Sequence, residues 1–435
     1  MLHIPLFLLA VNAAAAATAP PTPQEIVYQH VANNANLTFQ PPSGFLKYPY
    51  LIPSGPYNQL WDWDSLFMGV AMFEFGSAPY LAGAMANFLD HTNLTNGQVQ
   101  GCLLPTGGTG TIFHAKPVVI QGAWLASSYQ NGSGAAIHFK QFQPQMAALL
   151  QYWSSNVRTD AKTGLPKWYN QLESGQDNLP LSQCPSSRSS CWNVTLHEMK
   201  LVSADVATFL YREYQAYSLF NQKWADEAEE DQQVRVYVKE SKRAETMANN
   251  IKQAMNEHLW DEELGYYVAL NTSEAALKEG TEVIRTRTDV MGFPLWSSIP
   301  TAKQATALRV NLLKKDMLSK YGIRSTSSSA AKYNNKNEIF PYSNWQGPVW
   351  VNANAVLSLG LMRYGYVKDA VDIAKRVVDA LANDLNKDNT WHEGYNSDNG
   401  GGLAAKGFLS WDTLVATWPE NVAKGVDPFE LSSQH

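Results

Sequence analysis

The chain has 435 residues, of which 45% are hydrophobic and 17% are charged, so it can bury a large core and is not an intrinsically disordered protein. Its net charge of −6, without a basic block, argues against nucleic acid as a partner. Aromatic residues reach 11%, including 14 Trp, which favours either a tryptophan-rich core or a carbohydrate site with exposed rings.

The N-terminus predicts a leader sequence. An apolar run begins at Met1 and leads into Ala13–Ala17, which is typical of a signal peptide over residues 1–19, although the run is not preceded by Lys or Arg. No later stretch reaches the ~20 apolar residues of a membrane helix. We therefore expect residues 20–435 to form one secreted domain that does not associate with a membrane.

The cysteines and the N-x-S/T triplets fit a secretory compartment. Cys184 and Cys191 bracket a Ser-rich loop, which predicts a disulfide, and Cys102 is then a buried thiol. There is no C-x-x-C unit, and we predict no metal and no cofactor. The predicted glycosylation acceptors are Asn36, Asn93, Asn131, Asn193 and Asn271.

Hydrophobic periodicity predicts helices along most of the chain. Residues 64–75 are apolar nearly all round, which indicates a helix buried inside a larger assembly. Residues 366–386 show the clearest helical period, whereas residues 224–259 are rich in charge and are predicted to form a solvated outer helix. Residues 265–270 give the best strand signal. Further helices are predicted over residues 22–33, 80–89, 117–130, 138–156, 200–222, 301–319, 350–364 and 408–417.

This mixture of fully apolar and polar-faced helices favours two concentric layers. The simplest architecture is an all-α toroid with inner helices ringed by outer ones. Its active site would lie in the loops at one end, because loops on a rigid scaffold commonly carry function. A helical-repeat solenoid is the alternative fold.

Two loops combine carboxylates with aromatic and amide residues. Glu173 and Asp177 lie in a stretch rich in Gly, Ser, Asn and Pro, which predicts a loop rather than a helix. Glu393 lies within residues 391–396, Trp-His-Glu-Gly-Tyr-Asn. Cleavage of a glycosidic bond needs one carboxylic acid of raised pKa and a second carboxylate, and aromatic surroundings supply the raised pKa. Composition alone also allows both to be ordinary solvated loop carboxylates.

A third stretch, residues 57–65, brings together a Tyr, a Gln, two Trp and two Asp directly before the buried helix. Asp64 can be interpreted as the N-cap of that helix, a purely structural role. Alternatively, Asp62 or Asp64 binds sugar hydroxyls while Trp61 or Trp63 stacks on the sugar ring.

Four motifs occur in order along the chain: Trp63-Asp64-Ser65; Glu173-Ser-Gly-x-Asp177-Asn178; Trp345-Gln-Gly347-Pro348-Val-Trp350 with Asn354; and Trp391-His-Glu393-Gly-Tyr395-Asn396. Together they resemble the catalytic domain of glycoside hydrolase family 63, and within it the mannosylglycerate hydrolase type. Trehalases are a more distant relative. The resemblance implies an (α/α)6 barrel and an inverting mechanism, with Asp177 as general acid and Glu393 as general base, roughly 6.5–9.5 Å apart.

The resemblance also implies a set of substrate-binding residues. Gln346 stands where the family often has Arg, and Lys116 is a candidate for the missing cation. Glu173 is the rival for the acid, and we expect it instead to hold its loop through backbone N–H groups. The predicted substrate-binding residues are Tyr57, Gln59, Trp61, Trp63, Asp64, Lys116, Gln121, Trp345, Gln346 and Trp391.

The sequence thus predicts a secreted, exo-acting α-glycosidase for a small α-glucoside or α-mannoside, such as a glycosyl-glycerate or an α-glucobiose. Its partner would be a small carbohydrate, and the chain would be a monomer or a homo-oligomer. A trehalase-like hydrolase and a non-catalytic sugar-binding protein are the alternatives. Asp384-x-Asn386-x-Asp388 resembles the start of a calcium loop, but its sixth position is Asn389 rather than Gly, so calcium is not predicted. His392 is expected to be a hydrogen-bonding neighbour of Glu393.

Overall fold

The computed structural model describes residues 20–107, 113–129, 137–169, 171–181, 200–338 and 343–432. The predicted signal peptide, the Cys184–Cys191 disulfide and the acceptors Asn131 and Asn193 lie outside these ranges. In the ranges described, no helix is long and apolar enough to span a bilayer.

Six helical segments form a closed inner ring. Each packs against the next, and the last packs back against the first. α2 is buried along its whole length, as an apolar helix at the centre of a fold should be. In ring order they are α2 (Asp62–Ala71), α4 (Val119–Tyr129), α8 (Ala204–Asp226), the 3-10 helix η4 (Asp289–Ser297), α12 (Val351–Arg363) and the 3-10 helix η5 (Ser410–Ala416).

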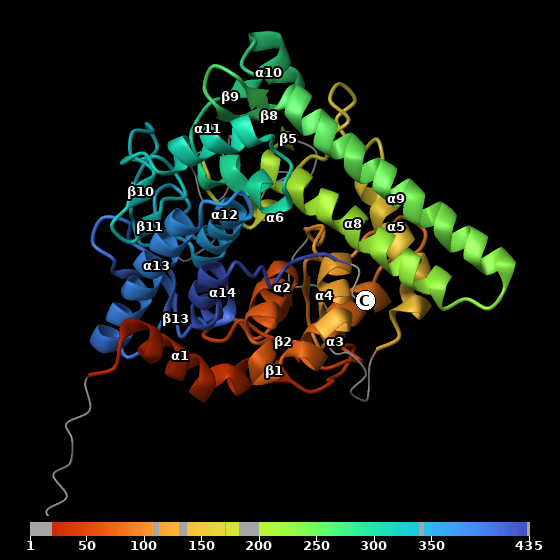
Figure 1. The fold of residues 1–435 in the computed structure, drawn as a ribbon, viewed down its shortest axis with the longest axis horizontal. Coiled ribbons are helices and arrows are strands. Elements are labelled where there is room, and N and C mark those ends of the chain that lie inside the picture. The colour runs from red at the N-terminus through yellow and green to blue at the C-terminus, as the bar shows by residue number, and fades with distance from the viewer. Residues whose placement is uncertain are drawn as a thin grey trace, which may run out of the picture.

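A second layer of helices covers this ring. The long helix α9 runs beside α8 (Figure 1), and its buried side chains recur every three or four residues, so that one face packs inward and the rest meets solvent. The two layers confirm the predicted (α/α)6 barrel. The outer helices are α1 (Pro23–Asn34), α3 (Ala78–Asp90), α5 (Gln143–Trp153), α9 (Asp231–His258), α11 (Ala302–Leu312) and α13 (Val367–Asp388).

Local sequence explains where several of these helices begin. Thr22 and Glu25 form a reciprocal capping box at the start of α1, and Thr301 and Gln304 do the same for α11. The remaining helical segments are short. They are η1 (Ala35–Thr38), η2 (Phe73–Phe75), η3 (Phe139–Phe142), α6 (Gln171–Ser174), α10 (Glu274–Glu279) and α14 (Trp418–Lys424).

The strands form small antiparallel ribbons in the loops between helices. The pairs are β1 (Phe39–Gln40) with β2 (Tyr50–Leu51), β3 (Leu60–Trp61) with β4 (Cys102–Leu103), β6 (Trp260–Asp261) with β7 (Tyr266–Tyr267), β10 (Leu318–Ser319) with β11 (Gly322–Ile323), and β12 (His392–Tyr395) with β13 (Gly402–Lys406). The one three-stranded sheet in the described residues has the order β5 (Leu201–Val202), β8 (Ala269–Asn271), β9 (Val283–Ile284).

Three secondary-structure predictions need correction. η4 was not predicted, because Gly292 and Pro294 inside it are normally helix breakers. The helix predicted over residues 301–319 ends at Leu312. The stretch Gln171–Ser174, predicted as loop, forms one helical turn before Gly175 takes a positive φ of 77°.

Of the three predicted glycosylation acceptors that the structure describes, two are exposed and one is buried. Asn36 and Asn93 are exposed, as glycosylation acceptors must be. The prediction is wrong for Asn271, whose side chain is buried and accepts a hydrogen bond from the backbone N–H of Ser273. Cys102 is buried, as expected.

Candidate active site

Asp177 lies just after α6, in a loop whose path depends on Gly175. A Cβ on Gly175 would come within 2.5 Å of the Trp63 ring, so the loop lies directly on this indole. The backbone N–H and the hydroxyl of Ser343 both donate to Oδ2 of Asp177, at 2.9 and 3.3 Å. Burial raises the pKa of the Asp177 carboxyl to about 7, although Ser343 and Lys116 act in the opposite direction.

Glu393 lies on β12 where the pairing with β13 shifts register between His392 and Gly394. Such a bulge re-aims a side chain, and here the buried carboxyl accepts the Tyr57 hydroxyl at 3.0 Å and the Ala405 N–H at 3.5 Å, both on Oε2. Burial raises the pKa of Glu393 to about 8, and the negative charge of Asp177 acts in the same direction. The two carboxyl groups, far apart in sequence, are therefore electrostatic neighbours.

Four buried indoles lie beneath both carboxyl loops, and we call them the tryptophan cluster: Trp63, Trp345, Trp350 and Trp411. Trp345 and Trp350 stack with centroids 4.0 Å apart, and Trp411 lies 5.5 Å from Trp63. The indole N–H of Trp345 donates to Ser343, which holds Asp177, while that of Trp411 donates to the carbonyl of Glu393. This apolar layer fixes both loops and keeps water away from the carboxyls, which raises their pKa values.

Asp64 is the third acidic group of the site. It accepts the Ser410 hydroxyl at 2.6 Å, and burial raises its pKa to about 7. The N-cap interpretation of Asp64 is wrong, because α2 already begins at Asp62 and the cap position is Trp61. Asp64 lies in the first turn of α2, where a negative charge suits the helix dipole.

Lys116 lies in the site but its charge is paired. Its ammonium is 3.2 Å from Oδ1 of Asp62 and its backbone N–H donates to Oδ2 at 2.7 Å. The ammonium also lies over the Trp63 ring, 4.8 Å from the centroid. Lys116 and Asp62 are both buried, so this ion pair is a fixed part of the wall.

Tyr57, Gln59 and Trp61 retain part of their surface. The rings of Tyr57 and Trp61 pack edge-on with their centroids 6.4 Å apart. Gln59 accepts a hydrogen bond from the indole N–H of Trp61 at 3.3 Å. These three side chains are half-buried, and Tyr57 also contacts Glu393, so they have surface left for a ligand.

Glu173, the rival for the acid, is held by other groups. Arg158 binds it with two hydrogen bonds of 2.8 and 2.6 Å, and the Tyr169 N–H donates to it at 3.0 Å. Both side chains of the ion pair are buried. Glu173 therefore holds its loop through a backbone N–H, as expected, with Arg158 as a partner that the sequence did not indicate.

Besides Trp63, which is buried in the tryptophan cluster, the structure places four predicted contacts in the protein interior or among protein partners. Gln121 is buried, accepting from Arg212 and donating to the carbonyl of Pro117. Trp391 is buried against the His30 ring, 4.4 Å away. Both lack a face for a ligand, and we remove them from the candidate substrate site.

The other two, Trp345 and Gln346, serve the loops rather than presenting free surfaces. Trp345 is fully buried in the tryptophan cluster. The amide of Gln346 donates to the Asn178 carbonyl at 2.9 Å and accepts from Asn334 at 2.7 Å. Trp345 therefore offers no sugar platform, and the half-buried Gln346 amide is already hydrogen-bonded at both ends to protein groups.

Sequence reasoning missed Ser343, Ser410 and Trp411. Ser343 lies two residues before the Trp345 motif, and proximity to that motif was a usable signal. Ser410 and Trp411 lie at the start of η5, which contains none of the four sequence motifs. This segment reaches the site because η5 packs against α2 when the inner ring closes.

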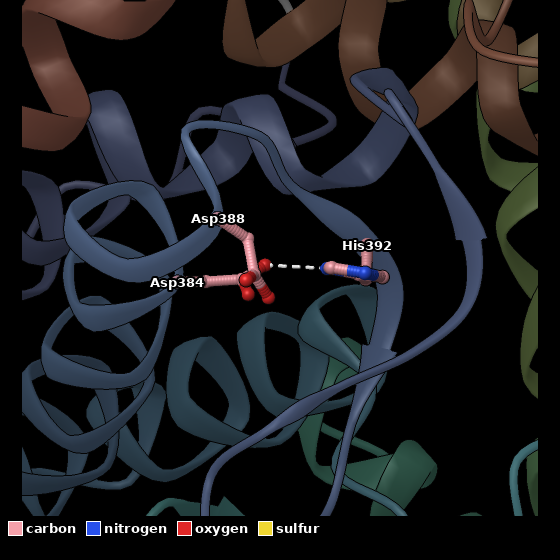
Figure 2. A group of neighbouring side chains, drawn as sticks. All are labelled: Asp384, Asp388 and His392. Carbon is pink, nitrogen blue, oxygen red and sulfur yellow. Dashed lines mark hydrogen bonds and ion pairs between the residues drawn. The ribbon is translucent and has the colours of Figure 1, made fainter.

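A separate group of metal-ligand side chains lies behind Glu393. Asp384 and Asp388, from α13, and His392, from β12, each offer an atom within 4.8 Å of the others (Figure 2). His392 Nδ1 and Asp384 are hydrogen-bonded at 2.8 Å, so this pair is satisfied within the protein. Among the described residues, no other such group of three His, Cys, Asp or Glu comes together.

A cleft of about 590 Å³ lies away from these carboxyls. It is lined by residues at the C-terminal ends of α2 and α4 and by α14, whereas Asp62 and Asp64 lie at the N-terminal end of α2. The cleft therefore belongs to the opposite end of the barrel and contains none of the predicted site residues.

An (α/α)6 barrel that gathers buried carboxyl groups over an indole layer at one end defines a glycoside hydrolase domain. The family model of the mannosylglycerate hydrolase MGH1-like glycoside hydrolase domain matches residues 57–411. The chain belongs to this family, as its four motifs led us to expect.

Solved structures share the fold at low sequence identity. The mannosylglycerate hydrolase of glycoside hydrolase family 63 from Thermus thermophilus, in complex with glucose, superposes with a TM-score of 0.65 at 18% identity, covering 89% of this chain and 99% of that one. Neutral trehalase from Saccharomyces cerevisiae gives a TM-score of 0.63 at 16% identity, covering 88% of this chain and 76% of that one.

Curated sequences that match include periplasmic trehalases. That of Escherichia coli strain SMS-3-5 is 22% identical over 384 residues, 80% of this chain and 63% of the relative, and that of Shigella flexneri is 22% identical over 363 residues, 75% of this chain and 59% of the relative. The chain thus spans about three fifths of the length of these relatives.

Proposed function

We propose that this protein is an inverting, exo-acting α-glycosidase that hydrolyses a small α-glucoside or α-mannoside, with Asp177 as general acid and Glu393 as general base. The observation that carries the proposal is the pairing of two carboxyls of raised pKa, on separate loops, over one tryptophan cluster. Because the negative charge of Asp177 raises the pKa of Glu393, double ionisation of the pair is disfavoured near neutral pH, and the proposed roles require the shared proton to be on Asp177 when the glycoside is bound.

The hydrogen bonds of Asp177 leave one of its oxygens for the transferable proton. Both Ser343 donors approach Oδ2, which leaves Oδ1 as the oxygen to carry the transferable proton. In the reaction, this proton passes to the glycosidic oxygen while the bond from the anomeric carbon to that oxygen breaks, and Asp177 is left ionised.

Glu393 has the complementary arrangement. The donors Tyr57 and Ala405 both approach Oε2, so Oε1 is the oxygen to accept a proton from water. The resulting hydroxide-like oxygen attacks the anomeric carbon from the opposite face and inverts its configuration. Glu393 ends protonated and Asp177 ionised, and exchange with solvent resets the pair.

The test separates the two roles by leaving group. Asp177→Asn should lower kcat/KM for glycosides by about 10²–10⁴ but leave hydrolysis of the α-glycosyl fluoride nearly intact, because fluoride departs without protonation. Glu393→Gln should lower both. Asp379→Asn, an exposed carboxylate on α13, is the matched control and should change neither. Near-normal glycoside hydrolysis by either site variant contradicts the proposal, and NMR of the first-formed anomer reports inversion.

A trehalase-like activity is the second candidate, favoured by the periplasmic trehalases that the chain resembles. Initial rates on trehalose, kojibiose, nigerose, mannosylglycerate and glucosylglycerate decide between them. Trehalose as the best substrate by kcat/KM would support the second candidate.

We also propose that the protein is secreted. The leader pattern of residues 1–19 and the periplasmic location named for the trehalases support this. Expression with and without residues 1–19, followed by immunoblotting of medium and cells, tests it: the full chain should reach the medium and the shortened chain should not.

A further inference from the structure

The charge balance around the candidate site is acidic. Asp62, Asp64, Asp177 and Glu393 surround it, and Lys116 is the cation whose charge lowers the pKa of both Asp64 and Asp177. Its ammonium already serves Asp62 at 3.2 Å in a buried pair. A new anion would have to compete for a cation that a protein carboxylate holds.

A second cation next to the site loops is also paired with a protein carboxylate. Arg158 is buried and binds Glu173 with two short hydrogen bonds, and its guanidinium lies 4.6 Å from the ring centroid of Tyr169. Removing Arg158 from Glu173 to serve a ligand would leave a buried carboxylate unpaired, which is strongly unfavourable.

Gln346 lies beside Asn178, the residue after Asp177, and its amide is neutral. Both ends of this amide are bound to Asn178 and Asn334. Asn178 in turn lies 3.4 Å from a carboxylate oxygen of Glu338. This side of the site therefore gains no positive charge from Gln346.

We infer that the site accepts an α-glycoside whose leaving group is uncharged, a polyol or a second neutral sugar, and discriminates against one that carries a carboxylate. The inference rests on the proposed function and concerns the same site. It runs against the substrate in the family's name, because the two buried cations beside the site loops, Lys116 and Arg158, are each paired with a protein carboxylate.

A matched pair of substrates tests this. 2-O-α-glucosylglycerol and 2-O-α-glucosylglycerate differ only in CH₂OH against carboxylate, and the mannosyl compounds form a second pair. We expect kcat/KM to be at least about tenfold higher for the neutral member, because an uncompensated like charge in a buried site is costly. Equal or better hydrolysis of the glycerate compounds would overturn the inference.

A gain-of-charge variant gives a second, independent measurement. Gln346→Arg should raise the ratio of glycerate to glycerol turnover severalfold, whereas the neutral control Gln346→Met should leave the ratio unchanged. An unchanged ratio in a folded Gln346→Arg protein counts against the inference. If that variant does not fold, the wild-type ratio decides alone.

Binding separates this inference from the proposed function. Calorimetry of the same pair with the Asp177→Asn variant needs no turnover, and tighter binding of the glycerol compound supports the inference even if the wild type hydrolyses neither substrate. Tighter binding of the glycerate compound overturns it. Failure of the proposed function would appear in a different measurement, because the wild type would then not hydrolyse the α-glycosyl fluoride.

Discussion

At the scale of single residues, the ionisation of the candidate base depends on one phenol. Tyr57 is half-buried, yet its hydroxyl reaches Oε2 of Glu393 at 3.0 Å and is close enough to Asp64 and Asp177 for both to raise its own pKa. Its hydrogen bond lowers the pKa of Glu393, opposing the effect of burial. Tyr57 thus favours the ionised form that a base needs.

Tyr57→Phe should therefore raise the pKa of Glu393. Because a base acts only when ionised, the acidic limb of the pH profile of kcat/KM should move to higher pH by about 1 unit, the value of one hydrogen bond to a charged group. Tyr211→Phe removes a phenol from α8 and is the control. A limb that stays in place in Tyr57→Phe would show that this bond does not tune the base.

Glu173 should contribute stability rather than chemistry. Glu173→Leu leaves the buried guanidinium of Arg158 without its partner, which should lower the free energy of unfolding by about 3–5 kcal/mol in urea titration. The double variant Arg158→Met with Glu173→Leu should recover most of this loss, because no charge is then stranded. Equal destabilisation in the single and double variants would contradict this explanation.

At the scale of elements, the two carboxyl loops are fixed by close backbone contacts. Gly175 approaches Trp63, and Gly394 lies against Trp350, where a Cβ would be 3.3 Å from the ring. A residue with a side chain at position 175 would push the Asp177 loop off the indole layer. The distance between the two carboxyls therefore depends on both loops resting on the same tryptophan cluster.

Gly175→Ala and Gly164→Ala form a matched pair that isolates this contact. Both glycines have φ near +70°, but position 164 has open space where a Cβ would lie, whereas position 175 has Trp63 at 2.5 Å. Gly164→Ala should cost about 1 kcal/mol of stability with unchanged kcat. Gly175→Ala should cost more and lower kcat/KM by at least about tenfold, since a small displacement of a catalytic group is expensive. Similar kinetics in the two variants would argue against loop positioning by Trp63.

At this scale, elements with a clear hydrophobic period could be predicted from the sequence, whereas elements stabilised by tertiary contacts could not. Helices with a strong apolar stripe, such as α13, were predicted nearly to their ends because the 3.6-residue period is visible in the chain. η4 was missed because its burial on the inner ring, rather than its local propensity, makes it helical despite Pro294. The carboxyl loops were found through motifs, but their meeting with Ser343 and Ser410 depends on tertiary contacts that no local pattern encodes.

At the scale of the whole molecule, the site lowers the stability of the protein at neutral pH. For a carboxyl whose pKa is raised on folding, the folded state binds more protons than the unfolded state between the two pKa values, so stability falls as pH rises through that window. For Glu393 the window runs from its ordinary value of 4.5 to about 8. The destabilisation is then fully present above it.

Glu393→Gln should therefore unfold at a higher temperature than the wild type at pH 8 and at nearly the same temperature at pH 4. The expected gain at pH 8 is on the order of 1–3 kcal/mol. Differential scanning calorimetry of both proteins across this pH range measures it. A gain that does not depend on pH would show that the charge of Glu393 is not its cause.

The ring of six inner helices joins residues from both ends of the described chain. η5 packs on α2, and Gln24 of α1 donates to the carbonyls of Val415 and Ala416. During synthesis, the barrel consequently lacks its final wall until residues 410–416 have emerged from the ribosome, so the apolar surface of α2 stays uncovered while the residues between α2 and η5 are translated. Production of this protein should accordingly depend on chaperones and on slow, cool expression more than its size alone would suggest.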